Sequence, residues 1–506
     1  MVEMAAPPPR MFEESLKGKA HAQLASAFAL MSGGPVLDGP EAAEHGRLEP
    51  ARARRGLKAL AARGAVVEGA PKEVGWERPN RRGTDPKSAY CLSNRWGYAV
   101  GVAAGHRGVG TGLIDARGRF REHGSTAPEC LVDEAIAVGA DYMQTLQSIA
   151  DQIFQCIKLR RDQLRQLGQD TAVDVRAITL GIPGQITGVR DADPSRRRVA
   201  TVLRNFGGKP VASDLGAILA RYEAELGFDP RTVPIRLEND ADCAAVGELH
   251  WGKGRGCRSL IVVKVSAGIG AGMILDGCLH YGHEATAGEI GHDPVHPAVL
   301  EHLNTGRPKE LLPLDPESEF LECSCPVPNS GHLEAFASGT AVTCRTLARR
   351  KRDIDLDSWR ESAAEVVEDA VRGRDEKAVR AIRDAGFLIG RRINTLAAAI
   401  GPERVLVTGP LADAGALFLG AIHDEIEGGD LPTTHAPRDV TLGTAGEAAR
   451  WIGVYGAARL ALEEGVWGPV RTVGSYPWPG YQAAEALVRA EAGKRANKRE
   501  PEPALA

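Results

Sequence analysis

The sequence has no apolar run that approaches the roughly 18 residues required by a membrane-spanning helix. Its first ten residues contain Glu3 and three prolines but no apolar segment, so no signal peptide is expected. The nine cysteines are an odd number spread through 506 residues, which favours reduced thiols over a disulfide framework. Together these absences predict a cytoplasmic protein that does not cross a membrane.

The net charge is also small, at −4, but it is unevenly distributed. Residues 1–95 hold 15 Lys and Arg against 11 Asp and Glu, whereas the remainder holds 47 against 55. A basic head on an acidic body suits a DNA-binding domain joined to a domain with a different task. The length predicts two or more domains, and 43% hydrophobic residues are ordinary for a globular protein.

The N-terminal part, after a Pro-rich mobile arm over residues 1–18, predicts a winged helix-turn-helix over residues 19–95. The periodicity and turn signals predict three helices and two strands. The expected helices are Ala20–Met31, Pro40–His45 and Pro50–Arg63, and the expected strands are Gly64–Glu68 and Ala89–Leu92.

The third of these helices has an apolar side and a basic side, and a basic loop separates the two strands. Such a helix fits the major groove of DNA, while a basic hairpin reaches the phosphate backbone or the minor groove. The alternative is a small helical cap whose arginines are simply solvated. The candidate DNA-binding residues are Arg52, Arg54, Arg55, Lys58, Arg81 and Arg82.

Residues 96–464 alternate short β-rich runs with helical stretches, which predicts an α/β domain with ligands at strand ends. Glu238-Asn-Asp-Ala-Asp242 places carboxylates and an amide at such an end, where they can accept a proton and hold hydroxyl groups. The glycines of Val265–Gly272 allow backbone N–H groups to approach phosphate, although a tight hairpin would use them equally well.

Further along, Gly282–His292 (GHEATAGEIGH) is followed by Cys323-Ser-Cys325 and Gly331-His-Leu-Glu-Ala335. In this order, over about 370 residues, these motifs resemble the ROK family of repressors and sugar kinases. The resemblance implies a winged helix in front of two α/β lobes of the actin-like ATPase type, with sugar and nucleotide meeting in the cleft. It also implies the sugar-binding residues Asn205, Asn239, Asp240, Glu289, His292 and Glu334, of which Asp240 matches the base in the kinases.

The resemblance further implies a structural Zn²⁺ site. The usual pattern is C-x-C-G-x-x-G-C-L-E, but His332 replaces the last cysteine, Pro326 replaces a glycine and the stretch is two residues longer. Two thiolates and two imidazoles still form a suitable tetrahedral shell. The alternative is a pair of buried thiols with surface histidines. The expected ligands are His292, Cys323, Cys325 and His332.

The phosphate side departs from the kinases of the family. Their D-x-G-G-T loop corresponds to Val102–Gly108, where Ala103 replaces the carboxylate that organises Mg²⁺, and Ala267 replaces a threonine. Losing that carboxylate should slow phosphoryl transfer by several orders of magnitude. The glycines of both loops, Gly105, Gly268 and Gly270, are then vestigial.

Retained sugar residues beside damaged phosphate loops predict a sensor: a homodimeric or homotetrameric transcriptional regulator, most simply a repressor, that responds to a sugar or sugar phosphate. Three alternatives stay open: an ATP-dependent sugar kinase with a regulatory DNA-binding head, a DNA-binding protein with a ligand-blind body, and a partner-binding protein without DNA. We also expect a loop insertion over residues 296–319 and a partly disordered C-terminal extension over 465–506.

Overall fold

The computed structural model describes seventeen stretches of the chain, five of which are three residues long or shorter. They are residues 36–38, 49–62, 66–69, 89–92, 97–105, 108–116, 131–134, 141–166, 168, 171–188, 197–199, 206–306, 313–315, 331–349, 353–354, 356–428 and 439–463. Within these stretches no helix combines the length and the apolar character needed to cross a membrane.

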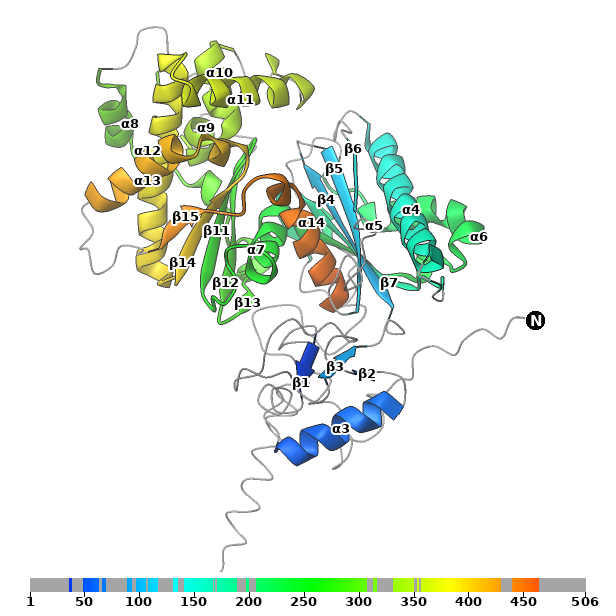
Figure 1. Ribbon diagram of the computed structural model, residues 1–506. Coiled ribbons are helices and arrows are strands. Elements are labelled where there is room, and N and C mark those ends of the chain that lie inside the picture. The colour runs from blue at the N-terminus through cyan, green and yellow to red at the C-terminus, as the bar shows by residue number, and fades with distance from the viewer. Residues whose placement is uncertain are drawn as a thin grey trace, which may run out of the picture.

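Two five-stranded sheets form the centres of two lobes (Figure 1). The sheet of the first lobe has the order β10-β7-β4-β5-β6, and that of the second has the order β13-β12-β11-β14-β15. The strands are β4 (Tyr98–Gly105), β5 (Gly108–Asp115), β6 (Leu131–Glu134), β7 (Val175–Ile182), β10 (Ile235–Asn239), β11 (Leu260–Val265), β12 (Ile269–Leu275), β13 (Cys278–Leu279), β14 (Arg404–Thr408) and β15 (Val440–Leu442).

The two sheets share one topology. In each, the first three strands in sequence form an antiparallel meander, and the fourth and fifth lie parallel to the first on its other side. The carboxyl ends of β4, β7 and β10 therefore meet at one edge, as do those of β11, β14 and β15. Ligands of α/β proteins bind at such edges, so both lobes can contribute to a site between them.

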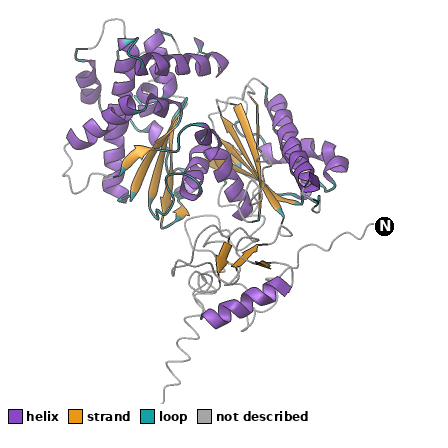
Figure 2. Ribbon diagram, in the orientation of Figure 1, coloured by secondary structure: helices purple, strands orange, loops and turns teal. Residues whose placement is uncertain are grey.

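Helices lie on both sides of each sheet (Figure 2). The first lobe carries α4 (Tyr142–Gln166), α5 (Val211–Leu219) and α6 (Glu223–Leu226), and the second carries α8 (Pro297–Asn304), α9 (Leu333–Ala337), α10 (Gly339–Leu347), α11 (Leu356–Val371), α12 (Glu376–Ile400) and α13 (Ala416–Gly428). Short elements are the β8–β9 hairpin (Ile186–Thr187, Arg198–Val199) and the 3₁₀ turns Ala220–Tyr222, Pro230–Thr232, His283–Ala285, Ile290–His292 and Pro410–Ala414.

Helices α7 (Asp240–His250) and α14 (Glu447–Ala461) lie between the two sheets and pack against each other (Figure 1). Helix α7 covers β11 and β12, whereas α14 covers β4, β5 and β7. Their backbones approach so closely that a Cβ atom added at Gly456 would lie 1.7 Å from the Cys243 carbonyl oxygen. The helix pair therefore joins the two lobes at a contact that only glycine allows.

A buried carboxylate fixes the segment that leads into α14. Glu248 on α7 is fully buried and accepts hydrogen bonds from the Thr444 backbone N–H at 2.7 Å and the Thr444 hydroxyl at 2.8 Å. It also accepts one from the Lys253 backbone N–H at 2.8 Å. These donors compensate for the desolvation of the charge, so Glu248 anchors the loop before α14 to the end of α7.

The N-terminal module contains a three-stranded antiparallel sheet, in the order β1 (Val36–Asp38), β3 (Ala89–Leu92) and β2 (Val66–Gly69). Helix α3 (Pro50–Ala62) packs against β2 through the fully buried Ala53 and Leu57. The predicted helix and both strands are present to within two residues, whereas β1 was not predicted. The expected helices Ala20–Met31 and Pro40–His45 lie outside the described residues, so the winged helix-turn-helix stays a prediction.

The predicted loop over residues 296–319 was wrong for residues 297–304, which form a helix. Helix α8 begins at Pro297 and buries Leu300 and Leu303. Pro297 occupies the first helical position, where its missing N–H costs nothing, and the His296 ring accepts a hydrogen bond from the Ala298 N–H at 3.2 Å. A proline interpreted as a loop signal is here the start of a helix.

Candidate functional site

The Glu238–Asp242 motif lies where β10 ends and α7 begins. The Asn239 side chain caps α7, because its oxygen accepts hydrogen bonds from the N–H groups of Ala241 at 2.7 Å and Asp242 at 3.2 Å. Its amide nitrogen donates to the Gly184 carbonyl at 2.9 Å. Both polar atoms of Asn239 therefore have protein partners, and one N–H remains for a ligand. The cap places Asp240 in the first turn of α7.

A buried network supports this turn from below. Glu238 is almost inaccessible and contacts Arg236 at 2.5 Å, the Tyr281 hydroxyl at 2.8 Å and Arg197 at 3.6 Å. Its second oxygen accepts the Asn239 N–H at 3.1 Å. Two arginines around one carboxylate satisfy a charge that would otherwise be costly to bury. Sequence analysis did not assign these partners, because they come from the residue before β9, from β10 and from the segment after β13.

Three predicted sugar-binding residues come from the second lobe. Glu289 precedes a 3₁₀ turn that His292 ends, with 3.7 Å between a Glu289 oxygen and His292 Nε2. Glu334, in the first turn of α9, accepts the backbone N–H of Ile269 at 3.1 Å. A Cβ atom at Gly268 would lie 2.4 Å from that carboxylate. The glycine-rich loop is therefore held against Glu334, a contact that the sequence did not reveal.

The electrostatics tie these residues to Asp240. Burial raises the pKa of Glu289, the neighbouring His292 lowers it, and the charges of Asp240 and Glu334 raise it again. We call Asp240, Glu289, His292 and Glu334 the sugar-side cluster. Carboxylates and an imidazole at this spacing can accept and donate hydrogen bonds to several hydroxyl groups of one small ligand.

Asp242 is a second, unassigned carboxyl of the same motif. It is 6% exposed, and burial raises its pKa well above the usual range, an effect that the negative charges of Glu238 and Glu289 enhance. Asp240 also raises the pKa, whereas Arg236 lowers it. Above the ordinary pKa of an aspartate, Asp242 in the folded protein therefore retains a proton that the same residue in the unfolded chain has lost.

Because the folded state binds this extra proton above the ordinary Asp pKa, stability should fall as pH rises from about 4 towards the raised pKa. Asp242→Asn keeps the shape and removes the titration. We expect the variant to gain melting temperature over the parent, by an amount that grows between pH 5 and pH 8. Thermal unfolding at several pH values measures this, with the exposed Asp276→Asn as control. A gain that does not change with pH would contradict the prediction.

The structure brings two of the four expected zinc ligands together. The ring centroids of His292 and His332 lie 5.6 Å apart. Burial lowers the pKa of His332, and the neighbouring His292 lowers it further. A neutral imidazole is the form that binds a metal. Cys323 and Cys325 lie outside the described residues, and within the described ones no three His, Cys, Asp or Glu side chains form a metal site. The histidine pair fits zinc only if both cysteines complete it.

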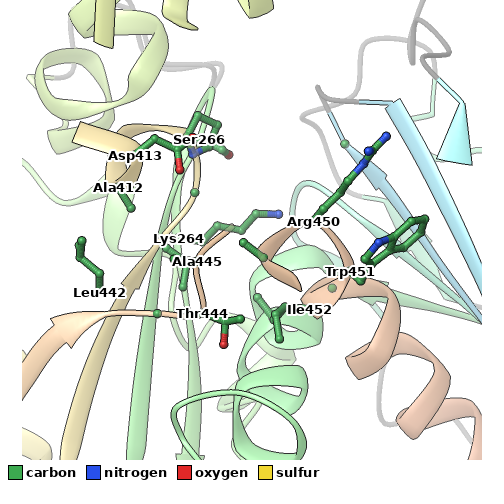
Figure 3. Close-up of a pocket in the computed structure, with 18 of the residues that line it drawn as sticks. Lys264, Ser266, Ala412, Asp413, Leu442, Thr444, Ala445, Arg450, Trp451 and Ile452 are labelled. Carbon is green, nitrogen blue, oxygen red and sulfur yellow. The ribbon is translucent and has the colours of Figure 1, made fainter. Parts of the chain in front are cut away.

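A cavity of about 950 Å³ lies between the lobes beside this cluster. It is lined by Ala103 and Gly105 of β4, by Asp240, and by the ends of β11 and β14. Figure 3 shows other lining residues, among them Lys264, Thr444 and Arg450. Neither Gly268 nor Gly270 lines it, and Glu289, His292 and Glu334 do not either. Asp240 is thus the predicted residue that belongs to both the sugar-side cluster and the cavity.

Lys264 is a cavity residue that sequence analysis missed. Its ammonium contacts the Asp240 carboxylate, and the two side chains are 25% and 15% exposed. Figure 3 shows the Lys264 side chain extending from β11 into the space between the lobes. The signal in the sequence was a lysine at the end of the apolar run Leu260–Val265.

The predicted DNA-binding residues belong to the separate N-terminal module. Arg54, Arg55 and Lys58 are exposed on α3, opposite its buried side. The helix is described at Arg52 but its side chain is not, and Arg81 and Arg82 lie outside the described residues, as does Asn205. The described part of the module therefore presents one basic helix face.

Comparison with known proteins gives one family and two kinds of relative. The ROK family model matches residues 163–464. A glucokinase of Halalkalibacterium halodurans is 27% identical over 227 residues, which cover 44% of this chain and 62% of the glucokinase. The DNA-binding transcriptional repressor Mlc of Escherichia coli is 27% identical over 204 residues, or 40% of this chain and 44% of the repressor. In both cases the match spans less than two thirds of the relative.

Among solved structures, a ROK family transcriptional regulator described as a homolog of the E. coli MLC protein has a TM-score of 0.57 and 19% sequence identity. The match covers 88% of this chain and 97% of that one. At this identity the likeness establishes the fold: two α/β lobes of the sugar-kinase type.

Proposed function

The chain belongs to the ROK family, and on this premise we propose that it is a DNA-binding transcriptional regulator whose sugar-kinase-like lobes sense a sugar or sugar phosphate without catalysis. The observation that carries the proposal is the contrast within one cleft. The sugar-side cluster is assembled from both lobes, whereas Ala103 brings only a methyl group to the cavity where phosphoryl transfer needs a metal-organising carboxylate.

The N-terminal module supports the DNA-binding half of the proposal. Helix α3 presents Arg54, Arg55 and Lys58 to solvent and is held by a buried apolar side against a small sheet. In the proposed winged helix-turn-helix this face contacts DNA, with Arg52, Arg81 and Arg82 adding phosphate contacts. Like Mlc, the chain would then act as a repressor.

The proposed mechanism is a change in the relative position of the lobes. A sugar that contacts Asp240 from the α7 side and Glu289, His292 and Glu334 from the second lobe favours a closed arrangement. Since α7 and α14 join the lobes, closure would shift the N-terminal modules of a homodimer or homotetramer and change their fit to two half-sites. A structural Zn²⁺ on His292, His332, Cys323 and Cys325 would hold the sugar-binding histidine in place.

An ATP-dependent sugar kinase with a DNA-binding head is the second candidate. The large cavity beside Asp240 favours it, because a pocket of that size can hold a nucleotide. This candidate predicts sugar-dependent ATP consumption, whereas the regulator predicts none.

A gel-shift titration with DNA flanking the protein's own gene, at fixed salt, tests the proposal. We expect specific binding that one member of a panel of sugars and sugar phosphates changes at least tenfold, which corresponds to about 1.4 kcal/mol of coupling. Zinc content is measured in parallel, together with ATP turnover. Specific binding that no sugar changes would leave a ligand-blind DNA-binding protein. The absence of specific binding would favour the kinase or a partner-binding protein.

A further inference from the structure

Lys264 occupies an unusual place for a lysine. Strand β11 is the central strand of the second sheet. All residues of Leu260–Val265 except Lys264 are buried and apolar. Alternation along the strand puts Lys264 on the same face as Leu260 and Val262, the face that α7 covers. A cation at this position must be compensated, because an unpaired charge in an apolar layer is costly.

Asp240 supplies that compensation across the cleft, and the resulting ion pair faces the cavity. Asp413 also lines the cavity, and two further acidic lining residues, Glu248 and Glu368, have partners of their own. Glu248 is held by the donors of Thr444 and Lys253, and Glu368 pairs with Arg372 and Arg374, each at 2.9 Å. Asp240 is therefore the lining carboxylate that engages Lys264.

The remaining lining of the cavity suits a ligand with an anionic end. Arg450 contributes further positive charge and lies 5.7 Å from the Trp451 ring centre. Gly105 at the end of β4 and Gly108 at the start of β5 also line the cavity, and without side chains they contribute backbone to its wall. At position 103 the methyl group offers no oxygen to a divalent cation, whereas Lys264 and Arg450 bring positive charge to the same cavity.

We propose that the cavity binds a phosphate ester without a divalent metal, that Lys264 is the residue that binds its phosphoryl group, and that Asp240 competes with this group for Lys264. The inference rests on the proposed function, because it names the ligand chemistry of the sensing cleft. When Lys264 turns to the phosphoryl group, the Asp240 carboxylate becomes available to a sugar hydroxyl. Phosphate binding and hydroxyl binding then favour each other.

The phosphoryl group can belong to a sugar phosphate that spans the cluster and the cavity or to a separate organic phosphate. Calorimetric titrations of the full-length protein in a buffer without Mg²⁺ or any other added divalent cation distinguish these sources, with a hexose 6-phosphate in one arm and ADP in the other. Binding in either arm supports the inference and identifies the source.

Substitutions at the two ends of the ion pair should change this affinity in opposite directions. We expect Lys264→Met to weaken binding at least tenfold, Lys264→Arg to retain it, and Asp240→Asn to strengthen it about threefold to tenfold, since the competing charge is gone. Lys158→Met, exposed on α4, is the control and should equal the parent.

The absence of binding in both arms, a strict requirement for Mg²⁺, or equal affinity of Lys264→Met and the parent would overturn the inference. Shifts of Lys264→Met and Asp240→Asn in the same direction would also overturn it. Lys264→Arg guards against a folding defect, since it keeps the charge and the compensation of Asp240. A sugar response on DNA without phosphate binding would overturn this inference and leave the proposed function standing. Phosphate binding without any DNA response would overturn the proposed function and leave the phosphate site standing.

Discussion

Replacing Glu289 by alanine is expected to abolish the effect of sugar on DNA affinity while leaving the DNA affinity of the ligand-free protein unchanged. Glu289 is partly buried beside His292, so its carboxylate would bind sugar hydroxyls with less competition from water than a fully exposed carboxylate meets. Hydrogen bonds to a charged group contribute about 1.5–3 kcal/mol each, so sugar affinity should fall by about 10–100-fold. Fluorescence anisotropy of labelled operator DNA, titrated with sugar, measures both quantities.

Glu301→Ala is the matched control for this experiment, because Glu301 is exposed on α8 and lies outside the sugar-side cluster. It should respond to sugar like the parent. A Glu289→Ala protein whose response is unaltered would remove Glu289 from the site. Loss of DNA binding in the absence of sugar would show that Glu289 has a structural role instead.

Adding one methyl group at Gly456 is expected to produce the largest loss of stability. The new Cβ atom would lie 1.7 Å from the Cys243 carbonyl oxygen, so α14 must move away from α7. Overpacking of this kind costs about 3 kcal/mol, which for a cooperative unit of about 150–250 residues, roughly one lobe, lowers the melting temperature by about 6–12 °C. Because the helix pair joins the lobes, the coupling between sugar and DNA should weaken as well.

Gly420→Ala provides the control, since a Cβ atom on this residue of α13 would meet nothing within 4 Å. Alanine is the better helix former, so Gly420→Ala should match or slightly exceed the parent in melting temperature. Calorimetric unfolding of the two variants side by side gives the comparison. Equal melting temperatures would mean that α7 and α14 separate at little cost.

The sequence predicted the alternation of strands and helices well, because each strand is a short apolar run that ends in a turn. It also predicted α3 and the strands after it, since the buried Ala53 and Leu57 follow a helical period. The prediction failed at α8, where Pro297 begins a helix, and at β1, whose three residues pair with β3 although the two strands are far apart in sequence. A strand that short carries no periodicity of its own.

The candidate site was harder to predict than the fold. The residues Asp240, Glu289 and Glu334 could be named from motifs, but their contacts depend on segments that are far apart in sequence. Lys264 reaches Asp240 only because β11 and the start of α7 face the same cleft. Glu334 holds the glycine-rich loop across 65 positions of sequence. Pairing over such distances follows from the topology, which single motifs do not encode.

The order of elements along the chain has a consequence for synthesis on the ribosome. Strand β4 begins at Tyr98, yet the helix that covers it begins at Glu447. At about 5–20 residues per second, translation of the intervening chain takes roughly 20–70 s. During that time the N-terminal module has already emerged while the first lobe lacks its covering helix. A chain that terminates before Glu447 would therefore carry the module and the strands of both sheets without the helix that covers β4.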